Sequence, residues 1–138
     1  MRNRRQAVVL VIFGLLAAAI PVLAHHSFTA EFDPDKSFSV KGILKHVDWT
    51  NPHVYFYVDV KNAETGKVDT WSFQSFPPGM LHRAGVTKDV FKIGEEVTVL
   101  ANPAKDGTKL LGSGNKIRYS SDGHEVLLLV AGRNYDRY

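Results

Sequence analysis

Short runs of alternating apolar and polar residues, separated by turns rich in glycine, proline and asparagine, follow one another through most of the chain. In the clearest run, Val54, Phe56 and Val58 would lie on one face of a strand, and Tyr55 and Tyr57 on the other. Alternation with a period of two is typical of half-buried β-strands. The pattern therefore predicts six strands, at residues 37–47, 54–60, 68–76, 97–101, 109–119 and 125–130.

The order of these strands limits the choice of fold. A short helix is predicted at residues 80–84, where a Pro-Pro-Gly sequence ends the third strand and Gly85 stops the helix. Gly42 changes the phase of alternation in the first strand, which indicates a bulge or sharp bend in a long, curled strand. We predict a mainly β, OB-fold-like Greek-key barrel with one short helix between strands 3 and 4. The alternative is an open β-sandwich.

The first 24 residues have the three parts of a cleaved signal peptide. Arg2, Arg4 and Arg5 form a basic start without acidic residues, and residues 7–20 are apolar apart from one glycine. A proline then breaks the apolar run, and Ala24 provides the small residue expected directly before the cut. We expect export by the general secretory route, followed by removal of residues 1–24.

Two alternatives concern this segment. A retained membrane anchor would require an apolar run of about 20 residues, and residues 7–20 are shorter than that. Arg4 and Arg5 half resemble a twin-arginine signal, so the export route stays open between the two systems. The chain has no cysteine for lipid attachment or a disulfide. We therefore expect a periplasmic protein with no stable membrane insertion after cleavage.

The remaining 114 residues are predicted to form one domain. Residues 25–36 are expected to be an extended arm, residues 37–131 the OB-like β domain, and residues 132–138 a polar C-terminal tail. The formal net charge of +3 comes from the three arginines of the signal peptide, so residues 25–138 carry 14 basic and 14 acidic residues. A neutral domain gives no reason to expect nucleic acid as a partner, because that binding depends on excess positive charge.

Four sequence blocks carry a resemblance to a known family: AHHSF at 24–28, WTNPH at 49–53, GEEVTV at 94–99 and NPAKDG at 102–107. In these blocks the chain resembles a bacterial family of small exported proteins that is catalogued only as a domain of unknown function. The resemblance covers nearly all of the chain after the signal peptide. It implies export and a small β domain, and it supplies no activity or binding site.

Histidines follow the expected cut directly. If cleavage falls after Ala24, the α-amine and ring of His25 can chelate one metal ion, and His26 can complete the site. Such nitrogen ligands suit copper or zinc. His53 and His82 are further candidate ligands, although a barrel need not bring them close together. The alternative is that residues 25 and 26 are only a solvated polar start.

Aromatic side chains form a second candidate surface. Trp49, Tyr55, Tyr57 and Trp71 are candidate contacts for a ligand or a periplasmic protein partner, because aromatic faces of OB-folds bind such ligands. The structural alternative is that these rings fill the core, and that Trp49 closes one end of the barrel. Small barrels require large side chains in their interior, which favours this alternative.

The sequence contains no recognisable catalytic motif. None of the serines lies in a G-x-S-x-G sequence, and no pair of carboxylates occupies matching strand positions. We therefore expect an exported, non-enzymatic binding or accessory protein that binds a metal through its N-terminal histidines. The first alternative is a structural or interaction subunit that docks on a periplasmic or membrane-associated partner. The second is a chaperone for a cofactor such as haem.

Overall fold

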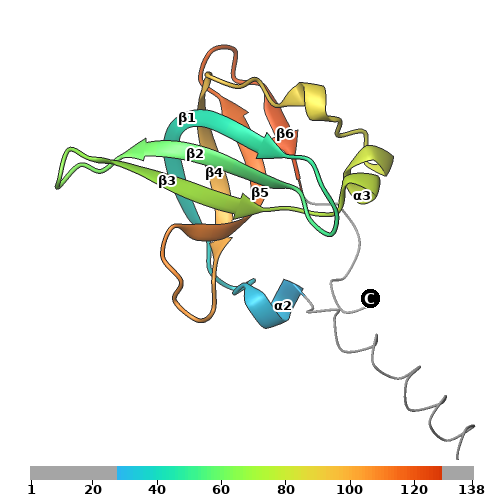
Figure 1. The fold of residues 1–138 in the computed structure, drawn as a ribbon, viewed down its shortest axis with the longest axis horizontal. Helices are drawn as coiled ribbons and strands as arrows, with labels where there is room; N and C mark the ends of the chain where they lie inside the picture. The colour runs from blue at the N-terminus through green and yellow to red at the C-terminus, as the bar shows by residue number, and fades with distance from the viewer. Residues whose placement is uncertain (1–27, 129–138) are drawn as a thin grey trace, which may run out of the picture.

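The computed structural model describes residues 28–128 as a small β-barrel (Figure 1). The predicted signal peptide, His25, His26 and the polar tail lie outside the described residues. None of the helices in the described part is long and apolar enough to cross a membrane. The elements are α2 (Phe28–Glu31), β1 (Phe38–Asp48), β2 (Tyr55–Lys61), β3 (Val68–Gln74), α3 (Pro78–Arg83), η2 (Lys88–Val90), β4 (Glu96–Pro103), β5 (Leu111–Tyr119) and β6 (Glu125–Leu127).

The strands form one sheet in the order β3-β2-β1-β4-β5-β6, and a parallel pairing of β3 with β5 closes the first five into a barrel. The helix α3 lies between β3 and β4, as predicted. The structure therefore confirms the OB-fold-like Greek-key barrel. The predicted strands are all present, with ends that differ by a few residues, and the short 3-10 helix η2 was not predicted.

The strand β1 is long and changes partners near Gly42. Its first half pairs with β4 and its second half with β2, and Ile43 pairs with both. A side chain at Gly42 would collide with the backbone oxygen of Asp59 on β2. Glycine is therefore required for the two strands to approach so closely. The alternation of burial continues unbroken through Gly42, because Ile43 is 43% exposed and Leu44 is fully buried. The phase change predicted at Gly42 is therefore wrong in position, and it lies at the register shift between Leu44 and His46.

Inward-facing side chains of all five barrel strands form the core. The alternation predicted for β2 is observed, because Phe56 and Val58 are fully buried whereas Tyr55 and Tyr57 are only partly buried. From outside the barrel, Leu81 of α3 and Phe91 after η2 add to the same core. The largest fully buried side chains are Tyr119, Phe32, Phe56, Phe73, Leu44, Leu81, Ile117, Leu128, Val54, Val58, Val97 and Val99.

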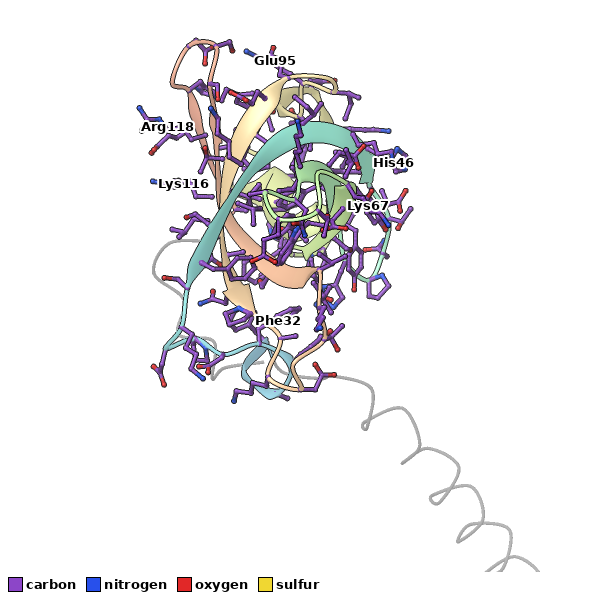
Figure 2. The ribbon with its side chains drawn as sticks, turned by 90° about the vertical axis from the view of Figure 1, so that its left-hand side faces the viewer. Phe32, His46, Lys67, Glu95, Lys116 and Arg118 are labelled. Carbon is purple, nitrogen blue, oxygen red and sulfur yellow. The ribbon has the colours of Figure 1, made fainter. Side chains whose placement is uncertain are left out.

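The described part of the arm before β1 is bound to the barrel, and residues 28–31 form the single helical turn α2 rather than the predicted extended segment. Phe32 is fully buried and forms an isolated bridge with Ala104, beyond the end of β4. The amide of Lys105 donates to the carbonyl of Glu31 over 2.9 Å. The Nδ2 atom of Asn102 donates to the carbonyl of Lys36 over 2.6 Å. Figure 2 shows Phe32 between α2 and this end of the barrel. These contacts fix the position of the chain that precedes β1.

Candidate ligand-binding groove

An open groove with a volume of about 860 Å³ lies where the arm meets the loop between β4 and β5. We call it the Trp71 groove, because Trp71 of β3 lines it together with residues of the arm and of this loop. Most of its lining is apolar, and this volume is within the usual range of small-molecule sites. The lining residues are Asp35, Lys36, Ser37, Phe38, Trp71, Pro103, Ala104, Gly107, Thr108, Lys109, Leu110 and Leu111.

Aromatic rings form the apolar part of the groove. Trp71 lies on the same side of β3 as Phe73, and the two rings are nearly parallel, with centroids 6.0 Å apart. The centroid of Phe38 lies 5.2 Å from that of Trp71. Trp71 and Phe38 are only partly buried, whereas Phe73 is completely buried. The aromatic cluster therefore extends from the buried core into the groove, where solvent or a ligand can contact the rings of Trp71 and Phe38.

Gly112 allows Phe38 to occupy this position. A side chain at Gly112 would place its Cβ atom 2.9 Å from Cζ of Phe38 and 3.1 Å from the carbonyl oxygen of Asn102. These distances are shorter than ordinary van der Waals contacts, so a larger residue would displace the ring. The glycine of β5 thus fixes the position of one ring in the groove.

One residue of the loop between β4 and β5 that lines the groove, Leu110, has a strained backbone conformation. Leu110 has a φ of 58°, in the left-handed region that residues other than glycine rarely adopt. Its carbonyl accepts a hydrogen bond of 2.8 Å from the amide of Ser72, next to Trp71. Strained residues of this kind are concentrated at ligand sites, and the contact with β3 holds this one in place.

Charged groups surround the apolar floor. Lys36 forms an ion pair of 3.0 Å with Asp33, and this hydrogen bond is the main reason why the pKa of Asp33 lies below its ordinary value of 3.8. Asp35 is exposed beside it. Lys109 is exposed and forms no ion pair within residues 28–128. The groove therefore offers two ammonium groups, only one of which has a carboxylate partner.

The four aromatic residues singled out in the sequence do not form one surface. Trp71 lies in the groove. Trp49 packs edge-on against Phe91, with ring centroids 6.0 Å apart, where it covers the core. Tyr55 and Tyr57 are on the outer face of β2, on the opposite side of the sheet from the inward-facing residues.

The hydroxyl groups of both tyrosines on the outer face are bound within the protein. Tyr57 donates to Asp48 over 3.1 Å, and Nε2 of His46 lies 2.6 Å from the other carboxylate oxygen of Asp48. Tyr55 donates to Gln74 over 2.5 Å. Burial raises the pKa of both phenols above 10.0, and the neighbouring carboxylates add to this effect. The two rings are therefore fixed in position, and their hydroxyl groups are already engaged.

The candidate metal ligands lie in different places. His53 is partly buried before β2, and its Nδ1 atom lies 3.1 Å from the carbonyl oxygen of Ser75. His82 is exposed on α3. Within the described residues, no three His, Cys, Asp or Glu side chains are grouped so that they could hold a metal ion. The predicted copper or zinc site depends on His25 and His26, so it stays a prediction.

Sequence reasoning found Trp71 but missed the other walls of the groove. The arm at 35–38 and the loop at 103–111 are far apart in the sequence, and periodicity cannot pair them. The sequence at 105–108 predicts only a turn between two strands. The available signal was the positive Lys109 next to Leu110 and Leu111, directly before a glycine-rich strand.

The barrel and the Trp71 groove define the chain as a small OB-fold-like β domain with a candidate ligand site beside its β4–β5 loop. Residues 12–113 match a family of unknown function, DUF6152, and the chain belongs to this family. The match confirms the resemblance noted in the sequence. Neither the curated proteins nor the solved structures contain a match to the chain.

Proposed function

We propose that the protein is an exported, non-enzymatic binding protein of the periplasm, and that it holds a small amphipathic molecule in the Trp71 groove. The ligand would have a flat apolar body and an acidic substituent. The observation that carries this proposal is the partly buried ring of Trp71, which extends the core into a groove of about 860 Å³.

The chemistry of the lining supports this class of ligand. A flat apolar body can pack against Trp71 and Phe38, since aromatic rings favour offset-stacked and edge-on contacts. Lys109 has no carboxylate partner among the described residues, so an acidic substituent would give its ammonium group a counter-ion. Binding rather than catalysis is favoured because the lining has no histidine or cysteine, and because Asp35, Ser37 and Thr108, which could otherwise act as a base or nucleophiles, are all exposed to solvent.

The test uses anilinonaphthalene sulfonate, a fluorescent probe with a flat apolar body and one negative charge. Trp71→Ala should abolish saturable binding of the probe, because it removes the largest ring of the groove. Trp49→Phe is the matched control, because Trp49 is the only other tryptophan and packs elsewhere, against Phe91. The control also leaves Trp71 as the single tryptophan, whose fluorescence should change on binding.

A second variant tests the charge. Lys109→Gln should weaken probe binding while leaving the apolar floor intact, and high salt should reduce the difference from the original protein. Near-ultraviolet circular dichroism must show that both groove variants remain folded, since partly folded proteins also bind this probe. The proposal is wrong if folded Trp71→Ala protein binds the probe as tightly as the Trp49→Phe control.

Export is tested separately from binding. The intact mass of protein purified from the periplasmic fraction should correspond to a chain that begins at His25. A mass that includes residues 1–24 would contradict the proposed processing and leave the groove proposal standing.

A further inference from the structure

The ring of Phe38 fills space that a side chain on β5 would otherwise occupy. Gly112 is buried, and a Cβ atom on it would lie 2.9 Å from Cζ of Phe38. The centroid of the same ring lies 5.2 Å from that of Trp71, on the strand β3 that pairs with β5. Phe38 therefore contacts both strands at the apolar floor of the groove.

The main chain at Phe38 is fixed by hydrogen bonds with the barrel. Phe38 pairs with Ala101 on β4. Two residues earlier, the carbonyl of Lys36 accepts a hydrogen bond of 2.6 Å from Nδ2 of Asn102. Nδ2 of Asn115 donates in turn to Oδ1 of Asn102 over 2.6 Å, and both asparagines are buried. With the main chain fixed, the side chain at position 38 determines how much of the floor is open to a ligand.

Loss of this ring would enlarge the groove rather than leave a closed cavity. Phe38 and Trp71 both line the groove and are only partly buried. The released space would be bordered by Gly112, which has no side chain, and by Phe73, whose ring centroid lies 6.4 Å from that of Phe38. An apolar cavity of about 150 Å³ binds one benzene molecule, so one further aromatic ring of a ligand would fit there.

We propose that Phe38 is the residue that determines ligand size in the Trp71 groove. A flat apolar body that packs against Trp71 and extends towards β5 meets the ring of Phe38 over Gly112, whereas a smaller body does not. The groove thus selects against extended ring systems, because a space that is already filled accepts a larger group only with strain. This inference rests on the proposed function, and it adds the size of the apolar body to the chemistry of the ligand.

The experiment compares naphthalene-1-sulfonate with pyrene-1-sulfonate, each displacing anilinonaphthalene sulfonate from the full chain. The two compounds differ in the number of fused rings and carry one negative charge each, so the contribution of Lys109 cancels in the ratio of their affinities. Phe38→Ala should raise this ratio in favour of pyrene-1-sulfonate by about tenfold or more, the lower end of what one methylene group decides in an apolar pocket. Phe38→Leu should raise it less, and it provides the same test if Phe38→Ala protein does not fold.

Val40→Ala is the matched control, because Val40 packs against the same core two residues further along β1 and does not line the groove. It should leave the affinity ratio unchanged. Gly112→Ala should lower the ratio, since its methyl group displaces the ring of Phe38 into the groove. Phe38→Leu in the same chain should restore the ratio, because leucine ends before the position of Cζ.

Near-ultraviolet circular dichroism identifies the variants that are folded. A ratio that is the same in the folded Phe38 variants as in Val40→Ala would overturn the role of Phe38 and leave the groove proposal standing. If neither sulfonate displaces the probe from the original protein, the groove proposal and this inference are both wrong.

Discussion

Replacement of Gly42 by alanine tests the closure of the barrel. The added methyl group would collide with the backbone oxygen of Asp59 and lie 2.9 Å from Cγ1 of Val58. Asp59 cannot move away easily, because β2 is paired with β1 on one side and with β3 on the other. Overpacking of this kind destabilises a protein by about 1–3 kcal/mol, and we expect a value near the upper limit because the obstacle is backbone.

An opposing effect makes the net value smaller. Alanine restricts the unfolded chain more than glycine does, which stabilises the folded state by about 0.4–1 kcal/mol. The net loss should therefore be about 2 kcal/mol, equivalent to a melting temperature lowered by about 10 °C. Urea unfolding followed by circular dichroism measures the loss in the free energy of unfolding. The slope of this free energy against urea concentration should be unchanged if the substitution does not affect the unfolded state.

The matched control is Gly79→Ala. Gly79 lies in the first turn of α3, and the only atom near its Cβ position is the flexible end of Arg83, at 3.7 Å. Alanine is the better helix former, so the variant should be as stable as the original protein or slightly more stable. If Gly42→Ala is as stable as Gly79→Ala, glycine is not required at position 42 for the close approach of β1 and β2.

Two further predictions concern the arm and the response to alkali. Phe32→Ala should release the arm from the barrel, since truncation of a buried phenylalanine costs about 3–5 kcal/mol of stability. Hydrogen exchange at the amides of Asp33 and Lys105 should then accelerate more than exchange in the barrel strands. Burial raises the pKa of Tyr119 above 10.0, so its contribution to stability is complete below pH 10.0 and is lost as pH rises through the raised pKa. Urea unfolding at increasing alkaline pH should show this decline in the free energy of unfolding. An equal decline in a Tyr119→Phe variant would contradict the role of Tyr119.

Local patterns were sufficient to predict the barrel. The alternation around Phe56 and the break between β3 and α3 follow directly from neighbouring residues, whereas the phase change predicted at Gly42 was wrong in position, since it lies at the bulge between Leu44 and His46. Each of them reflects a constraint that acts within one strand or turn. The fold class could therefore be predicted without knowledge of which strands pair.

The groove could not be predicted in the same way. It depends on the parallel pairing of β3 with β5 and on the contact of the arm with the β4–β5 loop, both of which join distant segments. The positive φ of Leu110 had no sequence signal, because glycine or asparagine is expected in that conformation. Similarly, the hydrogen bond of His53 depends on Ser75, 22 residues away, so the sequence could propose the imidazole as a ligand but not its orientation.

The arm forms part of the proposed binding site. Residues 35–38 form one wall of the Trp71 groove, and Phe32 and Glu31 hold the preceding chain against the end of β4. Release of the arm should therefore weaken probe binding in Phe32→Ala, although this variant leaves every lining residue of the groove in place. In contrast, Trp71→Ala should weaken probe binding without faster hydrogen exchange at the amides of Asp33 and Lys105, because the contacts of Phe32 and Glu31 are intact. If Phe32→Ala binds the probe as tightly as the original protein, the bound position of the arm has no part in the site.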